Sequence, residues 1–295
     1  MKIAYIDKKN CTLEVKSKLL KVDEQKIPLR LIDTLVLAKS SHINSSDLVK
    51  LTKEGISILM LSSRGRDIAI VQSASSQNAQ LKLAQYNAQH KALEVAKRLI
   101  TQKVKLHTVQ LQKHHIELEI SELLAQIDSV TSIESLLGIE GSFSKLYFSY
   151  FFSLFSKRLH QGKRSKNPPQ DPLNAMMSFV YMMIYNLITV KLLSYGFEPS
   201  IGFLHKPFRS HNALSSDLME LFRADINEFV WTLFNSEKLK SSDFSKKNGV
   251  YLKYSSRKEI WSDFKEFMKK LEPNIDKEIS YIRSILWVVK VNMIF

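Results

Sequence analysis

The sequence predicts an α+β fold in which a small, mostly β domain precedes a larger helical domain. Short segments rich in Val, Ile and Leu, separated by turn-forming residues, occupy the chain up to about residue 72. From about residue 79, apolar residues recur instead every three or four positions, the period of amphipathic helices. A polar segment at 72–78 is the expected linker. We therefore place the domains at residues 1–75 and 79–295.

The N-terminal domain is expected to be built from short strands and one short helix. The helix is predicted at Ser45–Lys53. The strands are predicted at Lys2–Ile6, Thr12–Val15, Leu19–Val22, Thr34–Leu37, Ile56–Leu61 and Asp67–Val71.

The second domain is predicted to be a succession of helices. A long one should run from about residue 79 to Leu106 and another from Thr108 to Gln126. A third should begin at Thr131, where Thr131–Glu134 forms a capping box, and extend to about Leu159. Three prolines then interrupt the pattern, and the remaining helices are expected at Pro172–Tyr195, Ser216–Phe234 and 255–271.

The composition indicates an anionic partner. The net charge of +14 and the pI of about 9.6 favour nucleic acid, with an acidic membrane surface as the competing explanation. The apolar stretch 175–193 is interrupted by Asn186, Thr189 and Lys191, so no run of about 18 apolar residues spans a bilayer. The N-terminus lacks the apolar stretch of a signal peptide, and the single Cys11 excludes internal disulfides and cysteine-based zinc sites. We expect a soluble, cytoplasmic protein with no membrane partner.

Possible metal ligands gather between Gly202 and Arg223. His205 lies in a Gly-Phe-Leu-His-Lys-Pro loop, and Asp217 and Glu220 follow three residues apart, on one face of a helix that Ser215 or Ser216 would cap. Acidic residues also favour helix N-termini because of the helix dipole, so the pair alone is better explained as a helix start than as a metal site.

Glu140 is a further candidate because Gly138 and Gly141 flank it inside a helical pattern. Glycine destabilises a helix interior by about 1 kcal/mol relative to alanine. These glycines therefore indicate either tight helix packing or the close approach of another molecule. The neighbouring aromatic residues at every fourth position are interpreted as core, and they are Phe143, Tyr147, Phe151 and Phe155.

Two basic runs accompany these acids. Residues 238–270 carry ten Lys and Arg against four acids. The other run contains no acid and consists of Lys157, Arg158, Lys163, Arg164 and Lys166. Solvated surface is one explanation, and contact with phosphates is the other. The sequence has no Gly-rich phosphate loop, dinucleotide fingerprint or nucleophile elbow.

Three segments together resemble the CRISPR-associated integrase family, whose members insert new spacers into CRISPR arrays. They are Gly138–Phe148, Arg164–Ser178, and Gly202–His205 leading to Asp217–Arg223. Segments 55–66 and 83–86 are also similar to the family's β-domain strand pair and to the entry of its first long helix.

The resemblance implies a small β-sandwich-like domain that dimerises, followed by a helical catalytic domain that binds metal and DNA. It implies that Glu140, His205 and Glu220 are the catalytic metal ligands, with Asp217 as an accessory ligand. It also implies a homodimer, and a small partner protein that bridges two such dimers on double-stranded prespacer and repeat DNA.

The loop after His205 departs from the family pattern because it lacks a Gly-Arg pair and a Ser-Leu. Arg209 is the expected substitute for contacting phosphate. Asn174, in the family-like proline-rich motif, is expected to orient a ligand or the backbone. Arg223 would lie off the carboxylate face of one continuous helix, so it is a weaker phosphate contact, and His211 ranks below His205.

A histidine with two or three carboxylates suits Mn²⁺ or Mg²⁺, and the histidine favours Mn²⁺. We expect metal-dependent transesterification, in which a DNA 3′-hydroxyl attacks a repeat-boundary phosphate. The alternatives are a nuclease or transposon-type integrase outside CRISPR, and a helical DNA-binding protein without catalysis.

Overall fold

The computed structural model describes residues 3–61, 68–74, 78–208 and 211–288. The chain divides into two compact units. The first comprises residues 1–82 together with 189–197, and the second comprises 83–188 together with 198–295. The β-rich unit therefore recruits a short segment from far along the chain. Gln72 links this segment to the sheet, since its amide donates to the backbone oxygen of Val190 and to Ser57 Oγ.

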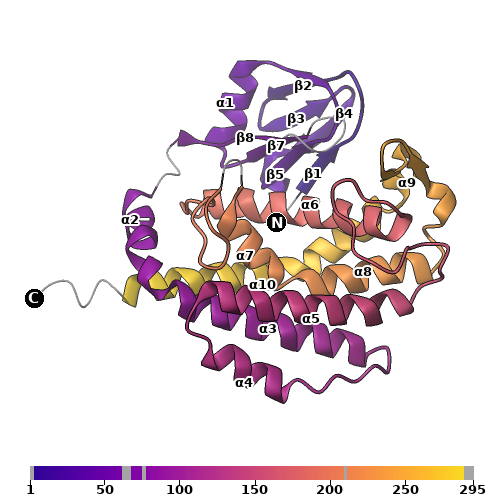
Figure 1. Ribbon diagram of the computed structural model, residues 1–295. Coiled ribbons are helices and arrows are strands. Elements are labelled where there is room, and N and C mark those ends of the chain that lie inside the picture. The colour runs from indigo at the N-terminus through magenta and orange to yellow at the C-terminus, as the bar shows by residue number, and fades with distance from the viewer. Residues whose placement is uncertain (1–2, 62–67, 75–77, 209–210, 289–295) are drawn as a thin grey trace, which may run out of the picture. The chain divides into compact units, whose positions relative to one another are not determined.

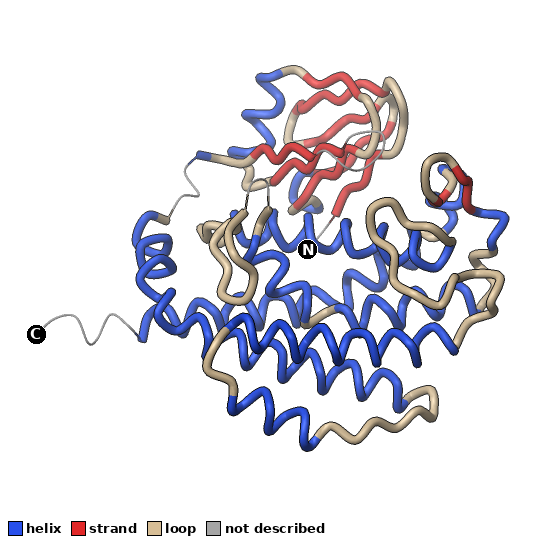
Figure 2. The backbone as a smooth tube through the Cα atoms, in the orientation of Figure 1, coloured by secondary structure: helices blue, strands red, loops and turns tan. Residues whose placement is uncertain are grey.

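The N-terminal unit contains two four-stranded sheets (Figure 2). One has the order β1-β5-β7-β8, with β8 antiparallel, and the other the order β4-β3-β2-β6, with β6 parallel to β2. The strands are β1 (Ile3–Ile6), β2 (Cys11–Lys16), β3 (Leu19–Val22), β4 (Gln25–Pro28), β5 (Thr34–Leu37), β6 (Ser41–Ile43), β7 (Ser57–Leu61) and β8 (Ile68–Val71). Helix α1 spans Ser45–Lys53, and a 3₁₀ turn spans Leu29–Leu31.

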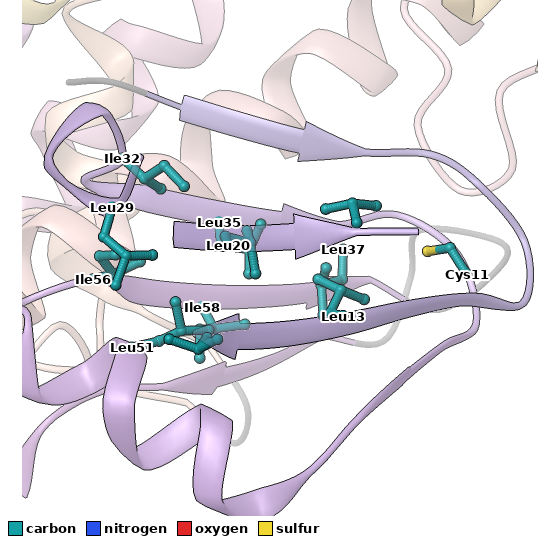
Figure 3. Close-up of a cluster of buried hydrophobic side chains, with 12 residues drawn as sticks. Cys11, Leu13, Leu20, Leu29, Ile32, Leu35, Leu37, Leu51, Ile56 and Ile58 are labelled. Carbon is teal, nitrogen blue, oxygen red and sulfur yellow. The ribbon is translucent and has the colours of Figure 1, made fainter. Parts of the chain in front are cut away.

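One apolar cluster holds this unit together (Figure 3). Leu13 and Leu20 enter it from one sheet, Leu35 and Ile58 from the other, and Leu51 from α1. In β2, buried and exposed residues alternate, as expected for a strand with one face on the core. The predicted β-sandwich-like domain is thus confirmed. The sequence prediction missed β4 and β6 because both are short, and β4 is an edge strand that ends in a proline.

The second unit is mainly helical, with one short hairpin of β9 (Phe244–Lys246) and β10 (Val250–Leu252) (Figure 1). Its central helix, α3, contacts α4, α5, α7 and α8. The helices are α2 (Ala79–Asn87), α3 (Ala92–Gln112), α4 (Ser121–Ser129), α5 (Ile133–Ser153), α6 (Pro172–Ser194), α7 (Ala213–Glu220), α8 (Arg223–Asn235), α9 (Tyr254–Glu259) and α10 (Trp261–Val288), with 3₁₀ turns at Ala88–Lys91 and Ser241–Asp243. Helices α2 and α6 each cross the boundary between the units.

Several helix boundaries differ from the prediction. No helix starts at Thr108, because α3 continues to Gln112 and ends where His115 adopts a left-handed conformation with φ of 59°. The cap of α5 is Ser132, whose Oγ accepts from the backbone N–H of Ser135, rather than Thr131. The helix predicted at Ser216–Phe234 is two helices, α7 and α8, separated by two buried residues.

Helix α6 is long and apolar enough to cross a membrane, but 72% of its most apolar window is buried within the protein. Its polar residues Asn186, Thr189 and Lys191 are buried as well. These features are typical of the core helix of a globular protein, and the cytoplasmic location stays a prediction.

Candidate metal centre

Two of the predicted ligands meet around a lysine. Glu140 of α5 and Glu220 at the end of α7 both contact the ammonium of Lys103, which projects from the middle of α3. The Lys103 Nζ to Glu220 Oε2 distance is 2.7 Å, and Lys103 also ion-pairs with Glu140 Oε1. Ser144, one turn after Glu140, donates to the same Glu140 oxygen at 2.6 Å. Three helices thus bring two carboxylates close enough to share one small cation.

The cations keep both carboxylates ionised. Burial raises the pKa of Glu220, but Arg223 and Lys103 outweigh it and lower that pKa to about 2. Burial also raises the pKa of Glu140, and Lys103 and Ser144 reverse this, so the net shift is downward. Both side chains are therefore negative at neutral pH, as ligands of a divalent ion must be.

Arg223 belongs to this cluster, contrary to the sequence argument that placed it off the carboxylate face. Its guanidinium lies 2.8 Å from Glu220 Oε1. The sequence argument measured its position from Asp217, whereas Arg223 follows Glu220 by three residues, a spacing that brings side chains together on a helical surface. The guanidinium also lies over the ring of Tyr181, 5.0 Å from its centroid. Glu220 therefore has a cation on each oxygen.

Asp217 anchors the loop that carries His205. Its carboxylate accepts from the backbone N–H groups of Phe203, Leu204 and His205 at 2.5, 3.0 and 3.0 Å. It also pairs with His205 Nδ1 at 2.7 Å. Asp217 is fully buried, with 0% exposure. Burial lowers the pKa of His205, but Asp217 outweighs it and the net shift is upward.

The same carboxylate explains Gly202. A Cβ atom at this position would lie 2.7 Å from Asp217 Oδ2 and 2.8 Å from the carbonyl carbon of Ala213. Any side chain here would push the anchor away from the loop. The Gly-Phe-Leu-His sequence is therefore a loop whose first residue leaves room for the acid that binds the next three.

Asp217 and Glu220 do not mark a helix start. Helix α7 begins at Ala213, with Asn212 as its N-terminal flanking residue and no acid in its first turn. Asp217 lies in the helix interior and Glu220 is its last residue. Ser215 and Ser216, the predicted caps, are buried within the helix. The helix-dipole explanation of the pair is therefore wrong, because both acids lie too far from the N-terminus.

Among the described residues, no three His, Cys, Asp or Glu side chains are assembled as a metal site. The donor set still fits a divalent ion on two observations. Glu220 Oε2 is buried, and among the described residues its partner is a cation, the Lys103 ammonium at 2.7 Å. His205 uses Nδ1 for Asp217, and its Nε2 has no partner within the described part of the chain. Such a carboxylate–histidine pair is the arrangement that orients metal-binding imidazoles.

Asn174 organises the loop that carries the first basic run. This fully buried side chain accepts from the Arg164 guanidinium at 2.8 Å and from the Ser165 backbone N–H at 3.0 Å. It donates to the backbone oxygen of Lys163 and to Asp171. Its contacts are therefore with the backbone and with Arg164, the second of the two roles expected for it.

The basic residues differ in their surroundings. Arg164 is held over the ring of Tyr181, at 5.6 Å from its centroid. Lys166 is exposed, and desolvation, followed by repulsion from Arg223 and Arg164, lowers its pKa. Lys157, Arg158 and Lys163 are exposed. Arg209 lies outside the described residues.

The remaining candidates are His211, the two glycines beside Glu140 and the aromatic residues of α5. His211 lies 2.7 Å from Ser216 Oγ, and its ring stacks on Tyr185. At Gly138 and Gly141, an added Cβ atom would meet no described atom within 4 Å, so packing within this chain does not explain these glycines. The aromatic residues Phe143, Tyr147 and Phe151 are buried, as predicted for core, and Phe155 is half-buried with its ring against Phe151 and Phe234.

Lys103 is the residue that the sequence argument missed. It has 2% exposure, and its neighbours Leu99, Ile100 and Val104 form the buried stripe of α3. A single lysine on an apolar helix face was a usable signal, since a lysine is almost never fully buried unless it is paired. Its partners lie 37 and 117 residues away in the sequence and only the fold reveals them.

Comparisons with known proteins agree on one family. The model of "CRISPR associated protein Cas1" matches residues 2–266. A CRISPR-associated endonuclease Cas1 from Thermodesulfovibrio yellowstonii is 29% identical, over 91% of this chain and 92% of the relative. The solved Cas1 of Thermotoga maritima superposes with a TM-score of 0.87 at 20% identity, covering 97% of both chains.

Other solved structures share the fold. A casposase bound to its integration product has a TM-score of 0.74 at 24% identity, covering 91% of this chain and 83% of its own. Similar chains also occur in a Cas6-RT-Cas1–Cas2 complex (TM-score 0.79, 20% identity, 96% of this chain and 34% of that one) and in a TtCas1–DNA complex (0.63, 14%, 97% and 91%). Because the family model spans most of the sequence and the N-terminal sheets and helical unit correspond to those of solved relatives, this chain belongs to the Cas1 family of CRISPR-associated proteins.

Proposed function

We propose that this protein is a metal-dependent DNA integrase and endonuclease that inserts short DNA fragments into a CRISPR array. The observation that carries the proposal is the convergence of Glu140 and Glu220, from separate helices, on one cation position. Relatives named CRISPR-associated endonuclease Cas1 support the class of reaction.

In this proposal, Glu140, Glu220 and His205 Nε2 hold Mn²⁺ or Mg²⁺. The bound ion supplies Lewis acidity to the reacting phosphate. Asp217 keeps the imidazole in place through Nδ1 and the three loop amides, which makes it a positioning residue. The 3′-hydroxyl of the incoming DNA forms a new bond to phosphorus as the repeat strand's own 3′-oxygen leaves. Water in place of that hydroxyl gives cleavage.

The basic loop would hold the DNA. Arg164 lies over the ring of Tyr181, which Arg223 also contacts, and the exposed Lys157, Arg158, Lys163 and Lys166 extend the positive surface. Arg209 remains proposed as a phosphate contact of the loop after His205. The open surface at Gly138 and Gly141, beside Glu140, leaves room for a nucleic-acid backbone. Binding held by such contacts weakens steeply with salt.

The proposed assembly follows from the family. We propose a homodimer formed through the N-terminal unit, and a small CRISPR-associated protein that bridges two dimers. Solved relatives in complexes with Cas2 and with DNA support these partners. The domain assignment, with dimerisation in residues 1–75 and catalysis in 79–295, belongs to the same proposal.

The test is strand transfer into a repeat-bearing plasmid with Mn²⁺, with and without the small partner protein. Glu140→Ala and His205→Ala should each lower the rate at least about a thousandfold, since a metal ion supplies several kcal/mol of transition-state stabilisation. Glu134→Ala is the matched control, because this exposed glutamate of α5 pairs only with exposed Lys206. Full activity of either folded site variant would refute the metal centre.

A transposon-type integrase is the second candidate, favoured by the fold shared with a casposase. It predicts integration into transposon-end targets and no preference for a CRISPR repeat, so competition between the two targets separates the functions. A DNA-binding protein without catalysis predicts salt-dependent affinity and no metal-dependent product.

A further inference from the structure

In the proposed metal centre, the charges of the two glutamates are already balanced by two cationic side chains. Glu140 and Glu220 contribute two negative charges, and Lys103 and Arg223 contribute two positive charges at contact distance. The next imidazole along α3 adds none, since burial, and then Lys103, lower the pKa of His107 to about 3. A divalent ion entering this cluster would leave a net positive charge in a buried place, which is unfavourable without an added anion.

We propose that Lys103 is a tethered cation that occupies the place between the two glutamates and exchanges them for a DNA phosphate when the divalent ion binds. This inference rests on the proposed function. It makes Lys103 a positioning residue that couples the binding of metal to the binding of DNA.

The geometry favours an exchange over a permanent contact. The recorded contacts of the Lys103 ammonium are with Glu140, Glu220 and Ser144 Oγ, the last at 3.3 Å. Its contact with Glu220 Oε2 is an ion pair at 2.7 Å, and Arg223 pairs with the other oxygen of the same carboxylate. The end of a lysine side chain can turn about several bonds while its stem stays packed against the apolar stripe of α3.

The exchange has a thermodynamic consequence. Without DNA, a metal ion must displace an ammonium that then has no anion to pair with. With DNA present, a phosphate oxygen accepts that ammonium and lies beside the ion. Metal and DNA therefore raise each other's affinity by the same factor, as reciprocity of coupled binding requires.

The wild-type protein provides the first test. The concentration of free Mn²⁺ is followed by electron paramagnetic resonance while the protein is titrated with and without a short DNA duplex. The Glu220→Gln protein with the same duplex corrects for Mn²⁺ bound by DNA alone. We expect Mn²⁺ to bind at least about tenfold more tightly when DNA is present, within the usual range for coupled sites. Equal affinities would overturn the inference.

Lys103→Met provides the second test because it removes the tethered charge and keeps an apolar stem. We expect tighter Mn²⁺ binding without DNA, little further gain with DNA, and a larger rise in melting temperature on adding Mn²⁺ than in the wild type. Lys103→Arg should behave as the wild type. The control is Lys105→Met, on the exposed side of the same helix. Unchanged Mn²⁺ affinity in Lys103→Met would contradict the exchange.

The two proposals fail in different ways. If the wild type carries out Mn²⁺-dependent strand transfer but binds Mn²⁺ with the same affinity with and without DNA, only the exchange is wrong. Should the wild type bind no more Mn²⁺ than Glu220→Gln with or without DNA, the metal centre itself is wrong. If Lys103→Met does not fold, the wild-type titration alone decides.

Discussion

The two units of this protein differ in the charged side chains that they bury beside their apolar cores. The N-terminal unit closes its two sheets around an apolar cluster that includes Leu13, Leu35 and Ile58. The helical unit buries Lys103, Asp217 and Glu220, each held by charged or polar partners. Apolar burial stabilises a fold directly, whereas a buried charge adds little net stability and is costly once its partner is lost. Stability is therefore expected to depend on the apolar cores of both units, and the proposed chemistry on the charged cluster of the helical unit.

The largest effect should come from the apolar core. Leu35→Ala removes a fully buried side chain from the β5 strand, between β1 and β7, and should destabilise the N-terminal unit by about 2–5 kcal/mol. Hydrogen exchange should show faster exchange in β5 and β7 and no change in α3. Val49→Ala, at a position that is 51% exposed, is the control and should change little. A similar loss in both variants would contradict this assignment of the core.

Acid should act on the charged core. Because the pKa of Glu220 is lowered to about 2 from 4.5, its ion pairs contribute fully above pH 4.5 and are lost as the pH falls towards 2. The loss is on the order of 3 kcal/mol. Urea unfolding followed by tryptophan fluorescence measures it, since Trp231, Trp261 and Trp287 all belong to the helical unit.

Two variants sharpen the acid measurement. Glu220→Gln should flatten the dependence of stability on pH below 4.5, because the position no longer titrates. Glu266→Gln, at an exposed glutamate paired with Lys270, should leave it as in the wild type. If Glu220→Gln retains the wild-type slope, the acid response originates elsewhere.

A smaller effect is expected at Asp217. Asp217→Asn replaces one of the two acceptor oxygens by an NH₂ donor. The amides of Phe203, Leu204 and His205 then lose their shared acceptor. Mn²⁺ affinity and activity should fall about 10- to 100-fold. Histidine NMR should show a lower pKa for His205, because burial lowers it and Asp217 no longer opposes this. Asp225→Asn, an exposed acid of α8, should change neither, and wild-type values in Asp217→Asn would reject the anchoring role.

The smallest effect should come from the exposed basic loop. Lys163→Ala removes one exposed charge and should weaken DNA binding slightly, while the slope of log affinity against log salt decreases by about one. Lys238→Ala, whose ammonium is already paired with Asp263, should change the slope less. Fluorescence anisotropy at several salt concentrations measures both, and equal slopes would place Lys163 outside the DNA-binding surface.

The sequence predicted the parts of the fold whose signals are local. Runs such as Leu19–Val22 and Thr34–Leu37 identified strands because apolar β-formers mark a buried sheet. The break between α7 and α8 was invisible, because Leu221 and Phe222 are ordinary helix residues whose burial is determined by the tertiary fold. The end of α3 was missed for the same kind of reason, since the left-handed residue there is His115 and not glycine.

The candidate site likewise combines features with a local sequence signal and features that depend on the tertiary fold. Glu140, His205 and Glu220 stood out by residue type and by family resemblance, and the structure brings the two glutamates together. The pairing of Lys103 required the fold, since it depends on helix packing, whereas the spacing of three between Glu220 and Arg223 could have indicated their pairing. The apolar helix face around Lys103 could have marked this lysine as buried, but the sequence does not show which acids it contacts.

The anchoring of the loop by Asp217 has a consequence for protein engineering. The loop around His205 is fixed by one side chain and three backbone amides, and backbone amides are present whatever the neighbouring side chains are. Provided that Gly202 leaves space for the acid and α7 keeps Asp217, the residues between Lys206 and α7 can be exchanged without displacing the imidazole. In the proposed integrase, we expect such exchanges to alter the choice of DNA target while the proposed metal ligands stay in place.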